Sequence, residues 1–356
     1  MFDERHYVPV LRWKRGERGA LRELTDGVKQ RTTPLIELPS SLFTLDYEPS
    51  NQNTRSMLIN VSGDIERAWG KRRAFCDLGL IPPSAEAIGG QHPVTLLWEY
   101  ARRKKLNLVP TISLRSSARY LAATFRVIEH DRAGACIRLS VAQLHSSHLR
   151  SDLSRLMNEG RLRPDEVDLT IDRGIIYEQS VRIPQMLVRV PDIGAWRSLT
   201  VLGGSFPKNL TGFSVGQHLR PRLEWRSWLQ EALNQDRAAR RPTFGDYTTQ
   251  HPVYREPPKR ANFSASIRYT TKEDWVVMRG EGVFNDDSAG YAQWPANATL
   301  LCERKEFCGP QFSAGDAYIV LRTKRGASNG NAETWLQAGV NHHMTFAVRQ
   351  IAKLAG

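Results

Sequence analysis

Carboxylates close four of the short β-rich runs in this sequence, and they are the residues best suited to chemistry. The four are Glu37, Asp77, Asp172 and Asp246. A charge in a buried strand is costly unless it lies at a rim or is paired, so these positions at the run ends are informative. Carboxylate oxygens are good ligands for divalent cations. We therefore predict catalytic roles for the four residues, with a divalent cation as the candidate cofactor.

Basic and hydroxyl side chains occupy similar positions in three other runs. Lys14 and Arg138 could hold a phosphate or stabilise a developing oxyanion. Ser205 lies in LGGSFP at 202–207, whose small residues would let a phosphate approach backbone N–H groups, although a tight turn explains this segment equally well. We predict these three residues as ligand-binding or phosphate-binding groups. Phosphoester hydrolysis is the reaction class that suits the mixture.

The same mixture of charges also has a structural explanation. Acids interleaved with Lys14 and Arg138 could neutralise one another in a salt-bridge network that closes the site and does no chemistry. The sequence contains no HxH or HExxH motif to link the acids to a metal centre. Convergence around an open pocket would favour catalysis, whereas pairing in a closed mouth would favour the structural role.

Eight β-rich runs separated by amphipathic segments must position these side chains. Their spacing over about 250 residues predicts a closed parallel (βα)8 barrel, the TIM-like α/β architecture, in which functional groups lie at the C-terminal strand ends. The runs are Val8–Lys14, Thr33–Leu38, Arg73–Leu78, Leu108–Leu114, Ala135–Ser140, Val167–Arg173, Ser198–Phe206 and Pro242–Thr249.

The pattern changes after the barrel. We predict a barrel-like domain over 1–250, a Pro-rich basic linker over 251–262, and an α+β appendage over 263–356 that docks on the barrel. Within the appendage, SASIRYTT and DWVVMRGEG predict a β-hairpin, GDAYIVLRT predicts another strand, and Thr334 to Leu354 predicts a closing helix. His342 and His343 are adjacent on that helix, so we expect one to pack and the other to be exposed.

Charge and hydropathy limit the partners and the location. The formal net charge of +13 and pI near 9.8 favour contact with nucleic acid, an acidic protein or phosphorylated ligands, but the basic residues are scattered, and a solvated basic surface is the alternative. No apolar stretch approaches the roughly 20 residues that cross a bilayer, and MFDERHY lacks a signal-peptide core. We therefore expect no membrane partner and a cytoplasmic location.

Blocks at both ends of the chain carry a family resemblance. They are YVPVLRWKRGERGALREL followed by PLIELP, then IRYTTKEDWVVMRGEG, FSAGDAYIV and ETWLQAGVNHHMTFAVRQI. In these blocks the sequence resembles the Beta protein family, named for a protein of a satellite bacteriophage. The resemblance implies a gene in a prophage, satellite or defence island, an anti-phage or toxin-antitoxin-like role, and a partner protein encoded by a neighbouring gene. It implies no catalytic residues.

Two functions are therefore predicted side by side. In the first, the chain is a binding or regulatory subunit that engages a partner protein or nucleic acid. In the second, the charged residues at the strand ends form a metal-assisted phosphoester hydrolase or nuclease. The missing catalytic motif and the implied genetic context favour the first, and the recurrence of charges at strand ends favours the second. Barrels host many functions, so fold alone does not decide between them.

Overall fold

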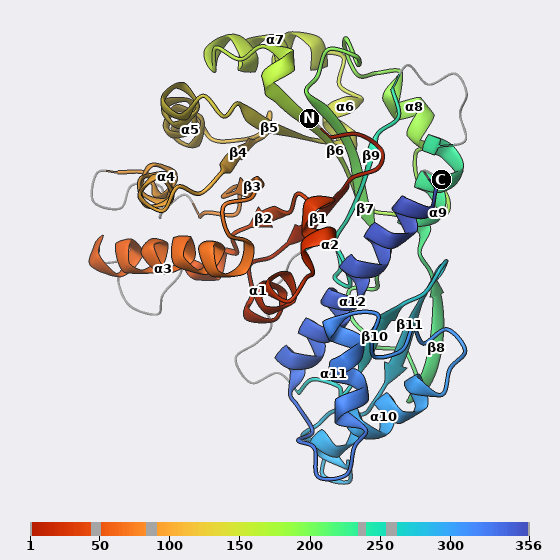
Figure 1. Cartoon of the computed structure of the whole chain (residues 1–356). Helices are drawn as coiled ribbons and strands as arrows, with labels where there is room; N and C mark the ends of the chain where they lie inside the picture. Colours follow the sequence, from red (N-terminus) through yellow and green to blue (C-terminus); the bar gives the residue numbers. More distant parts are fainter. Residues whose placement is uncertain (1, 44–50, 83–90, 234–239, 254–261, 355–356) are drawn as a thin grey trace.

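The computed structural model describes residues 2–43, 51–82, 91–233, 240–253 and 262–354. Its main feature is a closed barrel of eight parallel strands, which confirms the predicted fold class (Figure 1). Each predicted run contributes one strand. In barrel order the strands are β1 (Tyr7–Leu11), β2 (Leu35–Glu37), β3 (Ala74–Asp77), β4 (Leu108–Ile112), β5 (Ala135–Ser140), β6 (Val167–Ile175), β7 (Ser198–Gly204) and β9 (Thr243–Asp246).

Helices follow the barrel strands and cover the outside of the barrel (Figure 1). Several begin at side-chain caps: the Ser117 hydroxyl accepts a hydrogen bond from the Tyr120 N–H, and the Ser140 hydroxyl accepts one from the Gln143 N–H. The helices are α1 (Arg15–Arg22), α2 (Asp26–Gln30), α3 (Asn51–Trp69), α4 (Pro93–Arg103), α5 (Ala118–Asp131), α6 (Val141–Leu144), α7 (Leu149–Glu159), α8 (Ile183–Leu187) and α9 (Leu223–Trp228), the last continued by a π-helical turn, Leu229–Leu233.

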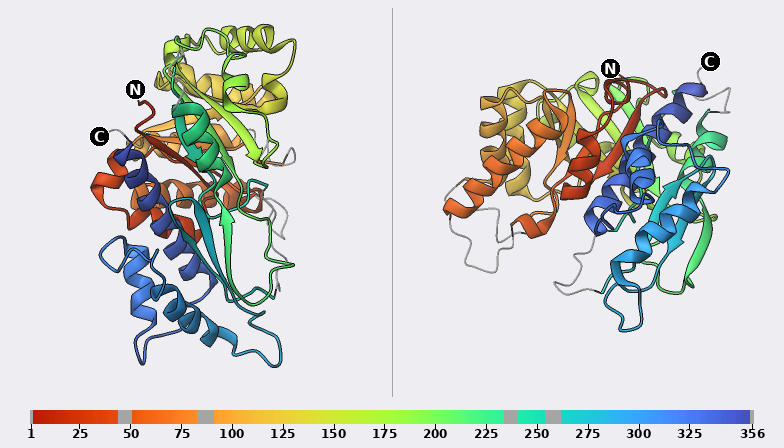
Figure 2. Two further views of the ribbon diagram at one scale, coloured as in Figure 1. Left: turned by 90° about the vertical axis from the view of Figure 1, so that its right-hand side faces the viewer. Right: turned by 60° about the horizontal axis from the view of Figure 1, so that its bottom comes forward.

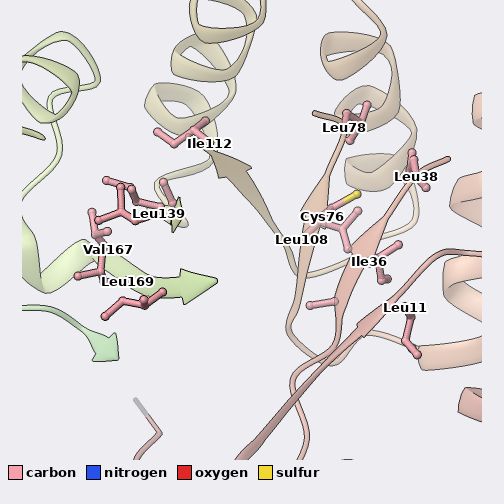
Figure 3. Close-up of a cluster of buried hydrophobic side chains, with 14 of the residues drawn as sticks. Leu11, Ile36, Leu38, Cys76, Leu78, Leu108, Ile112, Leu139, Val167 and Leu169 are labelled. Atoms are coloured by element: carbon pink, nitrogen blue, oxygen red, sulfur yellow. The ribbon is translucent and has the colours of Figure 1, made fainter. Parts of the chain in front are cut away.

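Alternate residues of each barrel strand face opposite sides, because side chains in a strand point alternately to its two faces. One set fills the barrel interior: Val8, Val10, Leu35, Phe75, Val109, Cys136, Leu202 and Tyr247. The other set packs against the helices, and Figure 3 labels members of that layer, including Leu11, Ile36 and Leu139. The interior is therefore a packed core, so access to it is at its ends.

Gly245 makes the interior sensitive to added volume. A Cβ atom at this position would lie 2.7 Å from the Val8 carbonyl oxygen and 2.8 Å from the Leu202 Cβ. We expect Gly245→Ala to lower the free energy of unfolding by about 2 kcal/mol, because the added Cβ forces the backbone or neighbouring side chains to shift. Chemical denaturation measures the change.

Gly27 is the matched control for this substitution. It lies in α2, and an added Cβ would meet no atom within 4 Å in the described structure. Gly27→Ala should raise stability by about 0.5–1 kcal/mol, because alanine restricts the unfolded chain more than glycine does. Equal stabilities of the two variants would contradict the close packing around Gly245.

A second, antiparallel sheet lies beside the barrel (Figure 1). The predicted hairpin is confirmed: β10 (Ile267–Thr270) pairs with β11 (Asp274–Arg279). The third strand, β8 (Gly216–Pro221), comes from the connection between β7 and β9 and pairs with β11. The chain thus leaves the barrel after β7, adds a strand to the second sheet, and returns through α9. The division at 250 and 263 stays a prediction.

The predicted strand GDAYIVLRT is wrong. These residues form helix α11 (Ala314–Arg322), which follows α10 (Gln293–Cys302). The Ser313 hydroxyl caps α11 by accepting a hydrogen bond from the Asp316 N–H at 3.1 Å. A short apolar run fits a strand or a buried helix equally well, so the N-cap was the decisive signal.

The final helix, α12 (Ala332–Lys353), confirms the predicted closing helix. It contacts α1, α2 and β1 on the barrel side, and β10 and α11 on the other side. Figure 2 shows this blue helix running between the barrel and the second sheet. Because α12 is covered on both sides, residues that are adjacent in this helix can both be buried. Among the described helices, none is both long and apolar enough to cross a bilayer.

Candidate functional site at the C-terminal mouth of the barrel

Four predicted site residues meet at the C-terminal end of the barrel interior. Glu37 is aligned with Asp77 in the β2–β3 pair, while Arg138 on β5 and Asp172 on β6 approach from the opposite wall. Each follows the inward alternation of its strand: Glu37 continues from Leu35, and Arg138 from Cys136. Barrel closure brings these residues together, although up to about 135 positions separate them in sequence.

The guanidinium of Arg138 is the centre of this cluster. Its Nη1 donates to Glu37 Oε1 at 2.9 Å and to Asp77 Oδ2 at 2.8 Å. Its Nε and Nη2 donate to Asp172 Oδ2 at 3.0 and 2.8 Å. Nη2 also donates to the Tyr247 hydroxyl at 2.8 Å. One cation therefore holds three carboxylates in fixed positions.

The remaining carboxylate oxygens have partners too. Glu37 Oε2 accepts from Arg12 Nε at 2.8 Å, and the Tyr247 hydroxyl donates to Asp172 Oδ2 at 2.6 Å. Asp77 Oδ1 accepts from the Gly79 N–H at 2.7 Å, and Asp172 Oδ1 accepts from the Gly174 N–H at 2.8 Å. Every carboxylate oxygen of Glu37, Asp77 and Asp172 thus accepts at least one hydrogen bond from the protein.

Burial and charge act against each other in this cluster. Burial raises the pKa of Asp77, and the charge of Arg138 only partly reverses the shift. Burial also works to lower the pKa of Arg138, but Tyr247 and the three carboxylates outweigh it, so this pKa is raised. The Arg138 side chain is 15% exposed and stays charged. The cluster is therefore held together by one permanent positive charge.

An open pocket of about 470 Å³ lies above the cluster. Its floor includes Glu37, Asp77, Arg138 and Asp172, and its wall is formed largely by the residues that follow β3 and β4. The wall combines apolar and polar side chains, among them Leu80, Ser113, Arg115, Ser116 and Gln143. The pocket opens at the C-terminal ends of the strands, where barrel proteins place their binding groups.

The opposite end of the barrel interior is closed by a second ion-pair cluster. Asp168 Oδ2 accepts from Arg73 Nη2 at 2.6 Å and from Arg197 Nη2 at 2.7 Å. The Ser198 hydroxyl donates to Asp168 Oδ1 at 2.6 Å. Asp168 is 2% exposed. The two ends of the barrel therefore differ: one is sealed by paired charges, and the other is an open pocket.

The predicted divalent cation does not fit the acids as they are arranged. A cation needs several oxygen ligands free to face it. Here the carboxylate oxygens face the guanidinium of Arg138 and the donors around it. Within the described residues, no group of three or more His, Cys, Asp or Glu side chains is placed to hold a metal ion. The guanidinium occupies the centre that a cation would need.

Asp246 lies away from the mouth. It is on the outer face of β9, where its Oδ1 accepts from the Tyr7 hydroxyl at 2.6 Å and its Oδ2 contacts His343 Nε2 at 2.8 Å.

The expectation that His342 or His343 would be exposed is wrong: both are 0% exposed. His342 contacts Asp316 Oδ2 through Nδ1 and the Thr270 carbonyl through Nε2, both at 2.8 Å. Both histidines are buried because α12 lies between the barrel and the second sheet.

Thr270, His343 and Asp246 form a hydrogen-bonded series with the connectivity of a nucleophile triad. The Thr270 hydroxyl lies 2.8 Å from His343 Nδ1. The charge that His343 carries when protonated, together with hydrogen bonds from His343, Tyr7 and the Thr248 N–H, lowers the pKa of Asp246 despite burial. Burial lowers the pKa of His343, although Asp246 opposes the shift. A neutral His343 therefore donates from Nε2 to an ionised Asp246. Thr270 is 0% exposed, so the series joins structural elements rather than meeting a substrate.

The other two predicted ligand-binding residues also lie outside the pocket lining. Lys14 precedes α1 as its N-cap residue, and its N–H donates to Glu17 Oε2 at 3.3 Å. The Ser205 hydroxyl contacts the carboxylate of Glu224, and the Ser205 N–H donates to it at 3.1 Å. Burial raises the pKa of Glu224 to about 7, although Arg222 opposes the shift. Ser205 thus fixes a buried glutamate in the described structure.

Sequence analysis missed two residues of the mouth, Arg12 and Tyr247. Both could have been found from strand alternation. Arg12 has the same parity as the interior residues Val8 and Val10, and Tyr247 has the parity opposite to Asp246. The same rule would have placed Asp246 on the outer face. A charged residue at the end of a run is a weaker signal than strand alternation, because it does not indicate on which face of the strand the side chain lies.

The fold and its mouth define a class: a TIM-like (βα)8 barrel with a charged pocket at its C-terminal end and a second antiparallel sheet joined through α12. Comparison with protein families then identifies the family of the chain. The model of the Beta protein family matches residues 7–349, nearly the whole chain. The chain belongs to the Beta protein family. Comparison with curated proteins finds no match.

Proposed function

We propose that this chain is a binding subunit of a bacterial or prophage-encoded anti-phage defence system, resembling toxin-antitoxin pairs, and acts in the cytoplasm with a protein encoded by a neighbouring gene. The family resemblance supports the cellular context. The observation that carries the binding role is the complete hydrogen bonding of Glu37, Asp77 and Asp172 around Arg138. Groups fixed in this way form a rigid recognition surface and are poorly placed to exchange protons or bind a metal.

The charge of the pocket floor indicates what it recognises. At the floor, three carboxylates face two guanidiniums, those of Arg138 and Arg12, so the floor has an excess of one negative charge. Arg115 adds one positive charge in the wall. A lysine or arginine side chain from a partner segment would meet complementary charge at the floor. The pocket volume of about 470 Å³ accommodates such a side chain with part of its backbone. The partner therefore inserts one basic side chain that reaches the floor of the mouth.

Blocking the pocket tests this role. Leu80 lines the pocket and is 36% exposed, so Leu80→Trp adds bulk at the entrance without touching the charged cluster. We expect binding of the neighbouring gene product to weaken by about ten-fold or more, with loss of phage protection in cells carrying the native locus. Calorimetry with the purified partner and a plaque assay measure the two effects.

Leu219→Trp is the matched control. Leu219 is 53% exposed on β8 and lies outside both large pockets. We expect this variant to bind the partner and protect cells as the wild type does. Full partner binding and protection by Leu80→Trp would contradict the role of the mouth.

A metal-assisted phosphoester hydrolase or nuclease is the second candidate. The specific observation in its favour is an open pocket with three carboxylates at its floor, at the end of the barrel where barrel enzymes perform chemistry. Here the test is cleavage of nucleic acid by the purified chain with Mg²⁺ or Mn²⁺, compared with Asp172→Asn. Metal-dependent cleavage that Asp172→Asn abolishes would overturn the binding role, whereas partner binding without cleavage supports it.

A further inference from the structure

A second pocket, also of about 470 Å³, lies where the segment after β7 and the end of β9 meet the second sheet and α12. Its chemistry differs from that of the barrel mouth. Three basic side chains line it, Lys208, Arg268 and Arg279, and no Asp or Glu occurs among its described lining residues. The pocket therefore carries a concentrated positive charge with no acid in its described wall.

The three basic side chains have no ion pair within the described residues, unlike Arg12, Arg138 or Arg197. Arg268 is the most informative. Its Nη1 donates to the Thr249 carbonyl at 2.7 Å, and its guanidinium stacks 4.6 Å from the Phe206 ring centroid. Burial lowers the pKa of Arg268 to about 10. A partly buried cation without a counter-charge is costly, so an anion in the pocket would stabilise it.

Polar atoms without partners provide an independent observation. Thr249 is 0% exposed and lines the pocket, and its hydroxyl makes no hydrogen bond within the described structure. The same holds, among described residues, for the amide nitrogen of Gln250 and for Nε of Arg279. All three groups can donate a hydrogen bond. Buried donors normally have acceptors, so the set lacks a ligand that supplies acceptor oxygens.

We propose that this pocket binds a phosphorylated small molecule. A phosphate group carries up to two negative charges and three acceptor oxygens, which suits three cations and several free donors better than a single carboxylate does. Arginine forks recognise phosphate oxygens in pairs, as Arg268 and Arg279 could do together. Phe263, Trp294 and Trp335 also line the pocket and would contact the apolar part of the ligand. This site is separate from the barrel mouth and does not depend on the proposed function.

Isothermal titration of the full chain with inorganic pyrophosphate tests the proposal. We expect saturable binding with a dissociation constant below about 1 mM, weakened about ten-fold or more by Arg268→Gln and by Arg279→Gln. A nucleoside diphosphate and a sugar phosphate form two further arms, and the tighter of them identifies the source of the phosphate. Arg325→Gln is the charge-matched control: this exposed arginine lies outside the pocket, and binding should not change.

Thr249→Val keeps the proposal testable if an arginine variant fails to fold. It preserves side-chain shape and removes only a buried hydroxyl that has no partner in the described structure, so stability should be kept or increased. Pyrophosphate binding should nevertheless weaken. The proposal is overturned if no phosphorylated probe binds below about 1 mM, or if Arg268→Gln, Arg279→Gln and Thr249→Val all bind as the wild type does.

Discussion

Arg138→Met should lower the free energy of unfolding by about 3–5 kcal/mol at neutral pH, because it removes the one cation that three carboxylates share. Glu37, Asp77 and Asp172 would remain close together in a site where the Arg138 side chain is only 15% exposed. Arg12 would still pair with Glu37, but Asp77 would keep only the Gly79 N–H. Denaturant unfolding monitored by tryptophan fluorescence measures the loss.

The pH dependence of this variant gives a sharper test. Burial already raises the pKa of Asp77 above 3.8 in the wild type, and removing Arg138 must raise it further. A carboxyl whose pKa is raised by folding contributes stability at low pH, and that stability is lost as pH rises through the folded-state pKa. The deficit of Arg138→Met should therefore be largest at neutral pH and shrink as pH falls toward about 4.

Arg163→Met is the control for Arg138→Met. Arg163 pairs with Asp165 at 3.2 Å, but both side chains are more than half exposed. Exposed pairs contribute little, so a change within about 0.5 kcal/mol is expected, with little dependence on pH. The carboxylates do not depend on Arg138 if Arg138→Met loses as little free energy of unfolding as Arg163→Met does, or if its loss increases at low pH.

The second large effect is expected at the junction between β9 and α12. Asp246→Ala should lower the free energy of unfolding by about 3–5 kcal/mol, because it removes the charged acceptor shared by the Nε2–H of His343 and the hydroxyl of Tyr7. These two buried groups, 3.1 Å apart, would then have only each other. Hydrogen exchange should show faster opening of α12, since this carboxylate joins the helix to the barrel. Asp287→Ala, at an exposed position, should leave stability and exchange almost unchanged.

Replacing both partners distinguishes a lost interaction from a lost side chain. The double variant Asp246→Leu with His343→Phe removes the charge and the polar ring together, so its stability should be higher than that of Asp246→Ala. Equal or lower stability of the double variant would show that packing, rather than the unpaired polar groups, sets the cost.

Removing His343 should also change the response to acid. Burial lowers the pKa of His343 below 6.5 in the folded state and that of His6 to about 4. The unfolded chain then binds protons that the folded chain does not, so wild-type stability falls as pH decreases below 6.5. The double variant keeps the parts of this loss that come from His6 and from His251, whose pKa burial also lowers. An unchanged slope between pH 6.5 and 4 would contradict the buried, neutral state of His343.

The barrel could be predicted from sequence because its signal is local and repeated. Each of the eight runs gives a short apolar strand, most of them are followed by a segment with helical character, and each run became one barrel strand. Alternation along a run even determines which side chains face inward: Gly245 on β9 and Tyr247 just after it face the interior, while Phe244 and Asp246 face the helices. Asp246 was misplaced because charge at a run end was weighed without this alternation.

Tertiary structure alone decided which charges meet and which are buried. Glu37, Asp77 and Asp172 converge on Arg138 only because barrel closure brings β2, β3, β5 and β6 around one axis. His342 and His343 are both buried only because α12 lies between two sheets. The side-chain period of a strand is encoded in neighbouring residues, so the barrel strands and their faces follow from local sequence. Contacts between distant segments depend on how the whole chain folds. These contacts form the charged mouth, the buried surroundings of the two histidines and the basic pocket.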